Sequence, residues 1–416
     1  PHPSNPDPLW SRGLGDVYKR QKYYLWLCML MCFFIPFIPK AQAVTSIAMG
    51  CSLVIAVFVF DREKLKTPFF SNALRLLTLF FLITIFLSVF TNGIINDLSE
   101  LRKIGQTLLV LYLFSLSDSP KKLKISFITG VFLSASVSLI NIALYVIQTG
   151  SYEFYTGEVV EQLMFTQRSY LGFFCVISTI FCLENIFKSN TTKDKRASLF
   201  IVFFMITTIF LISSRTAVIL LIIVLTTTAF KTLNRKLRII GFVGILAFLL
   251  TALLVNKNLS QRVFYSTDDY RSSFIEKIKT HEPRYLIWTQ SLDIFHKNKN
   301  KLFGIGFGKT QEKLRERYKE IDIPKKRDWF LERDFNSHNQ YLDLLLSTGI
   351  VGLVFFLAFL FAIIFLHKHS VYSINLLICL MVFMLFENTF HRTFGVFIMA
   401  LIFYLSIQPF LKKLNR

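Results

Sequence analysis

A succession of long apolar segments, separated by connections rich in Lys and Arg, constrains this chain more than any other feature. Hydrophobic residues make up 53% of its 416 residues, more than one soluble core of this size readily buries. Such segments are typical of membrane spans, since a helix rises about 1.5 Å per residue. The chain is therefore predicted to be an all-α, polytopic integral membrane protein. Its 12 predicted transmembrane helices are 23–39, 43–60, 70–90, 104–117, 125–148, 169–187, 198–213, 215–230, 239–255, 339–366, 372–387 and 393–410.

The charges predict the orientation of these spans. Lys and Arg number 47 against 26 Asp and Glu, an excess that cytoplasmic connections explain without nucleic acid. If the N-terminus is cytoplasmic, every inside connection is basic, and the short outside connections hold few basic residues. The positive-inside rule therefore favours cytoplasmic placement of both termini. The inside connections contain Arg62, Lys64, Lys66, Lys121, Lys122, Lys124, Lys188, Lys193, Lys195, Arg196, Lys231, Arg235, Lys236, Arg238, Lys368, Lys412, Lys413 and Arg416.

The same pattern divides the chain into five parts. Residues 1–20 contain four prolines and no helical period, so we interpret them as a disordered or non-native leader. Residues 21–255 hold the first nine predicted spans, 338–410 the last three, and 411–416 a cytoplasmic tail. Residues 256–337 are predicted to form an extracytoplasmic loop domain, with 18 Lys or Arg against 12 Asp or Glu. That balance suits an anionic partner, such as a lipid pyrophosphate or an acidic glycan; a solvated surface near lipid headgroups is the alternative.

Neither a cofactor nor a metal is predicted. Asp268, Asp269 and Asp322 lack the spacing of metal ligands relative to the histidines of the loop. All six cysteines lie in apolar segments, so we expect no disulfide in an external loop and no cysteine-based metal site. They are Cys28, Cys32, Cys51, Cys175, Cys182 and Cys379.

His338 is the candidate proton acceptor. Ser337 and Gln340 have the spacing of a capping box, which predicts that His338 lies in the first turn of a helix continuing to about residue 366. The positive end of the helix dipole would favour a neutral imidazole there. The alternative is a capped helix start at which His338 and Asn339 only bind lipid headgroups.

Three arginines are candidates for an anion clamp. Arg168, Arg215 and Arg284 are predicted to lie on the same face of the membrane as His338, where charged residues tend to be functional. A guanidinium stays charged and its planar fork matches phosphate oxygens, so converging arginines would hold a pyrophosphate. Snorkelling of each arginine to the interface is the alternative. The helix starting at Pro283 is predicted to lie partly in the membrane interface, with Trp288 as its aromatic anchor.

Other polar and glycine-rich stretches carry weaker predictions. Asp343 lies one turn after Asn339 and is a candidate for orienting the His338 region. Glu387, His391 and Arg392 are expected to form a second polar cluster, with structural contacts as the alternative. Residues 304–308, which read Gly-Ile-Gly-Phe-Gly, are interpreted as a flexible turn rather than a nucleotide loop, because we expect neither a strand before them nor a helix after them. Gly349 and Gly352 are expected to allow close helix packing.

Four stretches resemble the family of the O-antigen ligases and O-antigen polymerases, in its order and spacing across about residues 165–405. The resemblance implies a multi-span glycosyltransferase of the bacterial inner membrane, which works without metal on the outer face. Its donor would be a glycan linked to a polyprenyl pyrophosphate. The stretches are Gln167–Gly172, Ser213–Thr216, Arg284–Trp288 followed by Leu302–Gly308, and His338–Leu342 followed by Gly349 and Gly352.

The chemistry of such a donor suggests a role for each candidate residue. Arg215 and Arg284 would stabilise the departing pyrophosphate, and His338 would accept the proton of the attacking hydroxyl. The acceptor would be the lipid A core for a ligase or a growing glycan for an O-antigen or exopolysaccharide polymerase. A lipid-linked glycan flippase and an inactive assembly subunit are the other classes, although no internal repeat of the kind expected for a transporter is seen. The predicted substrate-binding residues are Arg168, Tyr170, Asn339, Trp288 and Asp343.

Overall fold

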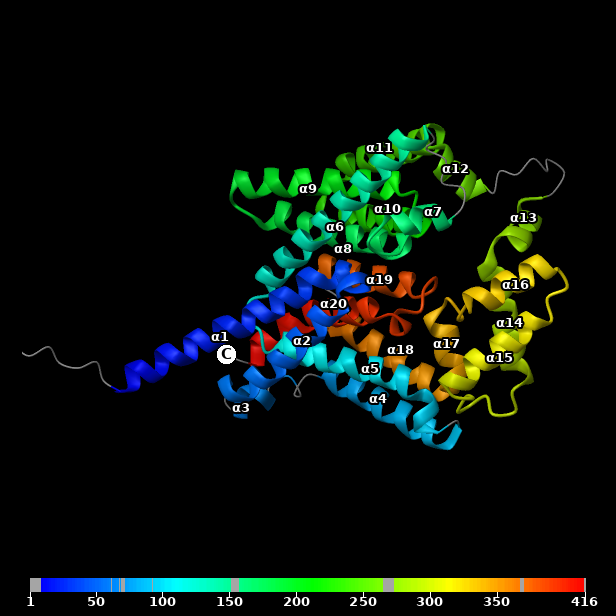
Figure 1. The fold of residues 1–416 in the computed structure, drawn as a ribbon. Helices are drawn as coiled ribbons and strands as arrows, with labels where there is room; N and C mark the ends of the chain where they lie inside the picture. Colours follow the sequence, from blue (N-terminus) through cyan, green and yellow to red (C-terminus); the bar gives the residue numbers. More distant parts are fainter. Residues whose placement is uncertain are drawn as a thin grey trace, which may run out of the picture.

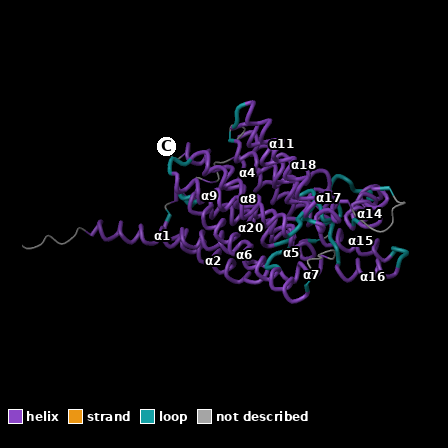
Figure 2. The backbone as a smooth tube through the Cα atoms, turned by 90° about the horizontal axis from the view of Figure 1, so that it is seen from above, coloured by secondary structure: helices purple, strands orange, loops and turns teal. Residues whose placement is uncertain are grey.

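The computed structural model describes residues 9–60, 62–66, 68, 72–91, 93–150, 157–264, 273–366 and 370–414. All regular secondary structure in these residues is helical (Figure 1; Figure 2). The helices are α1 (Leu9–Phe34), η1 (Ile35–Phe37), α2 (Ile38–Val59), α3 (Arg62–Lys66), α4 (Asn72–Thr91), α5 (Ile94–Ser115), α6 (Pro120–Thr149), α7 (Gly157–Leu163), α8 (Arg168–Lys188), α9 (Thr192–Leu211), α10 (Arg215–Thr232), α11 (Arg235–Val255), α12 (Lys257–Phe264), α13 (Phe274–His281), α14 (Pro283–Lys297), α15 (Phe307–Lys319), α16 (Pro324–Arg333), α17 (Gln340–Ser347), α18 (Gly349–Leu366), α19 (Val371–Phe383), η3 (Thr389–His391) and α20 (Thr393–Leu414).

Long apolar helices support the prediction of an integral membrane protein. By length and composition, five stretches of the described residues could cross a membrane, and three shorter apolar helices accompany them. Most described residues of each predicted span are helical, although the spans 23–39 and 339–366 each extend over more than one helix. The number of twelve spans and their orientation stay predictions. The five stretches are Lys19–Val59, Leu74–Thr91, Pro120–Thr149, Arg168–Lys188 and Arg215–Thr232.

Two helices begin earlier than the apolar pattern predicts. The helix α1 starts at Leu9, so residues 9–20 of the expected leader are helical, while residues 1–8 lie outside the described part. Each residue added to a helix forms one more backbone hydrogen bond, unless a proline interrupts it. No proline occurs between Pro8 and Pro36, so the helix can begin well before the apolar segment. The helix α5 starts at Ile94, ten residues before the predicted span, because its polar first turns are paired inside the protein. The buried Asp97 carboxylate accepts hydrogen bonds from Ser88 and from the backbone of Gly308.

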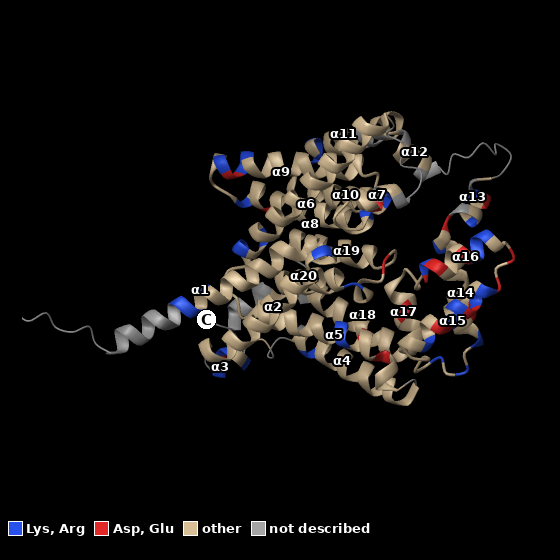
Figure 3. Cartoon of the chain, viewed as in Figure 1, with Lys and Arg blue, Asp and Glu red and all other residues tan. Residues whose placement is uncertain are grey.

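The bundle has two different ends. The helices α8 and α20 supply many of its fully buried side chains. The start of α1 and the end of α20 lie at one end, and α13–α16 cover the other (Figure 1). Figure 3 shows that most Lys, Arg, Asp and Glu residues lie in the parts of the chain towards these two ends. An apolar middle between charged ends is what a bilayer requires.

The helices α14–α16 have a small apolar core of their own. Ile287 and Ile294 of α14, seven residues apart on one helix face, are buried there together with Leu314, Tyr318 and Phe330. Helix neighbours cover this face of α14, whereas Tyr285 and Leu292 of the same helix are exposed, so the partial interfacial placement of α14 stays a prediction. The helices α14 and α15 also pack against α17, which brings the covering segment to the residues after His338.

The predicted continuous helix 339–366 is interrupted between α17 and α18. Gly349 has a φ of +66°, and a Cβ there would lie 2.3 Å from the carbonyl oxygen of Leu302. Ile305 and Gly306 donate backbone hydrogen bonds to the carbonyls of residues 346 and 347 at 2.9 Å. Residues 304–306 are therefore fixed against the interruption, and α15 begins at residue 307, which corrects both the flexible turn and the absence of a following helix. The glycines are needed because two backbones meet here.

Candidate active site

Arg215 and Arg284 each stand at a helix start and share one carboxylate. Arg215 is the first residue of α10, and Arg284 follows Pro283 in the first turn of α14. Glu282 directly precedes α14, and its Oε2 accepts a hydrogen bond from Arg215 Nη2 at 2.8 Å. Its Oε1 lies 3.5 Å from Arg284 Nη1. Glu282 therefore brings together two guanidinium groups from distant parts of the sequence.

Glu387 extends this contact to His338. Arg284 Nη2 donates a hydrogen bond to Glu387 Oε1 at 3.0 Å, and His338 Nδ1 lies 3.4 Å from Glu387 Oε2. We call the continuous series Arg215, Glu282, Arg284, Glu387 and His338 the arginine–histidine chain. The three residues predicted to be catalytic thus belong to one network, connected by two carboxylates.

The surroundings of Glu387 keep it ionised. It lies between α19 and η3 and is buried, which by itself raises the pKa of a carboxyl group. The nearby charges of His338 and Arg284 act in the opposite direction and lower the pKa of Glu387 overall. A carboxylate facing Nδ1 favours the tautomer with the proton on that nitrogen, which leaves Nε2 as the basic atom.

His338 lies outside the helix, contrary to the prediction. The N-cap is Asn339, whose Oδ1 accepts hydrogen bonds from the backbone N–H groups of Tyr341 and Leu342. Gln340 does not complete a capping box, because its Oε1 accepts instead from Phe390 N at 2.9 Å. His338 precedes the cap with a φ of +42°, in the left-handed region that few non-glycine residues adopt. Strained backbone of this kind is found preferentially at functional sites.

Arg168 is a buried cation that forms no ion pair with the described residues. It is the first residue of α8, and its side chain is almost entirely enclosed. Neither Nη1 nor Nη2 has a hydrogen-bond partner among the described residues. A buried charge normally requires a partner, because removal from water costs several kcal/mol. The described residues therefore leave both terminal nitrogens of this guanidinium without a hydrogen-bond acceptor.

Close packing brings the starts of α8 and α10 together. A Cβ on Gly172, one turn after Arg168, would lie 2.6 Å from Ala217 Cβ and 2.8 Å from Ser214 Oγ, the residue before Arg215. The glycine therefore permits a helix contact that a larger residue would prevent. Arg168 and Arg215 are therefore the first residues of two helices that pack against each other.

Tyr170, Trp288 and Asn339 occupy different surroundings. Tyr170 is fully buried, and its hydroxyl donates to the carbonyl of Asn388 at 3.4 Å. Trp288 lies beside Phe386, with ring centroids 6.3 Å apart, and its indole N–H has no partner in the described part of the chain. Asn339 serves as the helix cap. The buried indole N–H of Trp288 is therefore a polar group that the described residues leave unpaired.

Asp343 and His391 form a separate pair. His391 Nε2 lies 3.0 Å from Asp343 Oδ2, whose other oxygen accepts a hydrogen bond from Ser337. Burial lowers the pKa of His391, but the charge and hydrogen bond of Asp343, aided by Glu100, raise it overall. Glu387 and His391, which were predicted to share one polar cluster, therefore have different ion-pair partners. Both carboxylate oxygens of Asp343 thus have partners within the protein, and one of them holds the Ser337 side chain next to His338.

Sequence reasoning missed the two glutamates that connect the site. The sequence patterns assign no role to Glu282, and they predict that Glu387 clusters with His391. For Glu282 a signal existed: a carboxylate at a helix start is stabilised by the dipole and lies beside a cation two residues on. For Glu387 none existed, since its partners lie 103 residues before it, at Arg284, and in the segment before α17.

The structure also bears on metal ligands and thiols. No group of three or more His, Cys, Asp or Glu that could hold a metal ion occurs among the described residues. Asp268 and Asp269 lie outside those residues. All six cysteines are free, five of them buried and Cys51 exposed.

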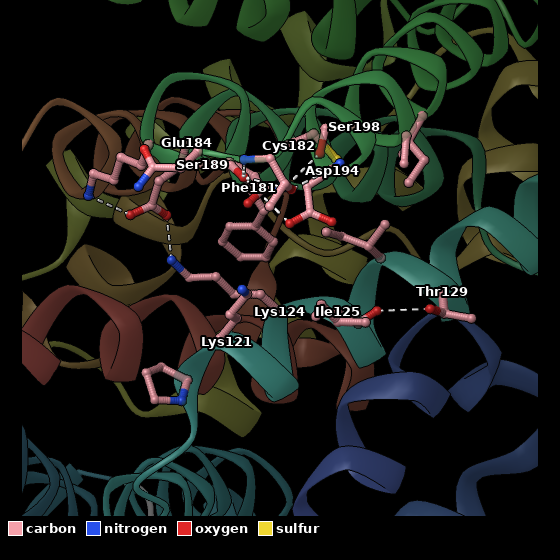
Figure 4. Close-up of a pocket in the computed structure, with 18 residues that line it drawn as sticks. Lys121, Lys124, Ile125, Thr129, Phe181, Cys182, Glu184, Ser189, Asp194 and Ser198 are labelled. Carbon is pink, nitrogen blue, oxygen red and sulfur yellow. Dashed lines mark hydrogen bonds and ion pairs between the residues drawn. The ribbon is translucent and has the colours of Figure 1, made fainter.

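A cavity of about 700 Å³ lies elsewhere, between α6, α8 and α9 (Figure 4). Its lining includes Lys188 at the end of α8, whereas Arg168 begins that helix, which is about 30 Å long for its 21 residues. Two of the lysines in the lining, Lys124 and Lys188, already pair with Glu184. This cavity therefore lies apart from the arginine–histidine chain.

The fold and the site together define a helical integral membrane protein that gathers cationic side chains and a histidine at one end of its bundle. Residues 200–357 match the protein family described as O-antigen ligase, so this part of the chain carries the domain of that family. The matched residues include Arg215, Glu282, Arg284 and His338; Arg168 and Glu387 lie outside them. No curated protein matches the chain. The domain supports a membrane glycosyltransferase of the ligase or polymerase type, with lipid-linked and acceptor glycans as substrates.

Proposed function

We propose that this protein transfers a glycan from a polyprenyl-pyrophosphate carrier to a sugar hydroxyl of the lipid A core, on the periplasmic face of the inner membrane. The observation that carries the proposal is the arginine–histidine chain, because it joins two phosphate-binding side chains to one proton acceptor. A polymerase of the same family would use the same donor site with a growing glycan as acceptor.

The acceptor hydroxyl oxygen attacks the anomeric carbon of the donor, and the bond from that carbon to the pyrophosphate oxygen breaks. His338 Nε2 takes the hydroxyl proton, a contribution of about 10²- to 10⁴-fold for a positioned base. Direct displacement inverts the anomeric centre. Glu387 faces Nδ1 of the imidazole and stabilises the positive charge that the ring gains.

Arg215 and Arg284 stabilise the negative charge that grows on the departing pyrophosphate. Their guanidinium groups are already oriented by carboxylates, so little reorganisation accompanies the reaction. Arg168 supplies a third cation that has no competing anion among the described side chains. Trp288 offers an indole N–H and an apolar ring beside Arg284, which suits a sugar or the first units of the lipid.

The role of His338 is tested with purified protein in vesicles, a lipid-linked donor and an acceptor. His338→Ala should lower transfer by 10²-fold or more, because the general base is lost, while donor binding changes little. His296→Ala, in α14 but outside the arginine–histidine chain, is the matched control for His338→Ala. Arg215→Lys should also impair transfer, since an ammonium lacks the planar fork of a guanidinium. Undiminished transfer by His338→Ala would remove its assigned role.

A further inference from the structure

Glu282 fills the place in which a phosphate group would contact both arginines. Its two carboxylate oxygens lie 2.8 Å from Arg215 Nη2 and 3.5 Å from Arg284 Nη1. Carboxylates and phosphates present oxygens to guanidinium groups in the same planar manner. In this structure the site thus contains an anion of its own.

The charges of the site do not allow Glu282 and a donor to share the arginines without cost. Arg168, Arg215 and Arg284 contribute three positive charges, and Glu282 and Glu387 contribute two negative ones. A pyrophosphate diester adds two more negative charges. Like charges held within a few ångströms in partly buried surroundings repel strongly, so one carboxylate must withdraw.

Of the two carboxylates, Glu282 is the one suited to withdraw. It is the single residue between α13 and α14, and its side chain is 15% exposed. Glu387, at 6%, is held between Arg284 and His338. Arg284 can therefore keep its bond to Glu387 while its contact with Glu282 is exchanged.

We propose that Glu282 is an internal competitor of the donor pyrophosphate. It pairs with Arg215 and Arg284 in the empty site, releases them to the donor, and takes them back as the lipid pyrophosphate leaves. The inference rests on the proposed function, which makes these arginines the pyrophosphate clamp. The released lipid pyrophosphate has one more ionisable oxygen than the donor diester, so a competing carboxylate is most useful at the step of product release.

Competition of this kind predicts an affinity that rises when the carboxylate is neutralised. The apparent dissociation constant equals the intrinsic one divided by the fraction of protein with free arginines. In Glu282→Gln this fraction increases, so binding of pyrophosphate should tighten by about 3- to 10-fold, as expected if the paired state holds most of the population.

The test measures binding of inorganic pyrophosphate to the full chain in nanodiscs by isothermal titration calorimetry. Glu312 is an exposed residue of α15, so Glu312→Gln removes the same charge from the α13–α16 segment and is the matched control. Tighter binding by Glu282→Gln, with less than about 2-fold change in the control, supports the proposal. Equal or weaker binding overturns it. If Glu282→Gln is too unstable to purify, Glu282→Asp replaces it; the shorter carboxylate reaches the two arginines less well, so tighter binding than in the unsubstituted protein is again required.

A third variant separates this inference from the function on which it rests. Arg215→Ala should weaken pyrophosphate binding by about 10-fold or more, the usual effect of losing a charged hydrogen-bond donor. If Arg215→Ala binds normally, the arginine clamp itself is wrong. If Arg215→Ala binds poorly and Glu282→Gln does not bind more tightly, only the competitor is wrong.

Discussion

At the scale of single residues, the charged side chains of the site differ in whether they form ion pairs within the protein. Arg215 and Arg284 share Glu282, and Glu387 lies between Arg284 and His338. Arg168 has no such partner for either terminal nitrogen among the described residues. A buried cation without a partner destabilises the ligand-free protein. We expect such a residue to be retained where it binds a ligand.

Arg168→Met tests this interpretation. Removal of the unpaired charge should leave the melting temperature of the ligand-free protein unchanged or raise it by a few degrees, because a buried charge without a partner is destabilising. The same variant should bind pyrophosphate about 10-fold more weakly, as expected for the loss of one charged donor. Arg392→Met, an exposed arginine close in sequence to Glu387, is the control for both measurements. A lower melting temperature in Arg168→Met would indicate a structural arginine.

At the scale of elements, the helix interruption at Gly349 positions the segment that contains His338. The short helix α17 lies between α14, α15 and α18, and residues 301–306 form backbone hydrogen bonds across the interruption. A straight helix through residues 339–366 would have no place for these contacts. Asn339 caps α17, and Asp343 within it holds Ser337, so the backbone on both sides of His338 is fixed.

Gly349→Ala should therefore destabilise the protein and reduce transfer. An added Cβ meets the carbonyl of Leu302 at 2.3 Å, and a φ of +66° is strained for alanine. Together these effects should cost about 2–4 kcal/mol, measured as a fall in melting temperature. Gly50→Ala, a helical glycine in α2 with no atom within 4 Å of the new Cβ, should leave the melting temperature unchanged or raise it slightly. Equal melting temperatures for the two variants would contradict the role of the interruption.

At the scale of the whole molecule, the two charged ends of the bundle suggest opposite sides of a membrane. The start of α1 and the end of α20 lie at one end, and α13–α16 lie at the other (Figure 1). The basic start of α9 lies towards the first end (Figure 3). If the positive-inside rule sets the orientation, the first end is cytoplasmic and the arginine–histidine chain faces the periplasm.

Cysteine labelling of intact cells tests this orientation. The substitution Lys313→Cys in α15 should give a protein that reacts with a membrane-impermeant maleimide, because α15 is expected to be periplasmic. Lys193→Cys in α9 should react only after the membrane is permeabilised. Native thiols should contribute little, since five of the six are buried and Cys51 lies in an apolar helix. Labelling of Lys193→Cys but not Lys313→Cys in intact cells would reverse the proposed topology.

The sequence alone determined the helical class of this protein and the positions of nearly all its long helices. Apolar runs and prolines act locally, so they can be interpreted without knowledge of neighbours. The sequence also singled out Arg168, Arg215, Arg284 and His338, since charged residues at the ends of apolar segments are costly unless used. The resemblance to the O-antigen ligase family, noted from these residues, is confirmed by the match over 200–357.

Only the tertiary structure decided which of these residues belong together. Glu282 and Glu387 become the connections of the site because α10, α14 and the segment between α19 and η3 meet in space. The helix start at Gln340 and the interruption at Gly349 likewise depend on contacts with distant backbone, at Met384 and at residues 301–306. Local sequence patterns cannot predict such contacts. The free energy that places the helix start at Gln340, with Asn339 as its cap, comes from groups far away in the chain.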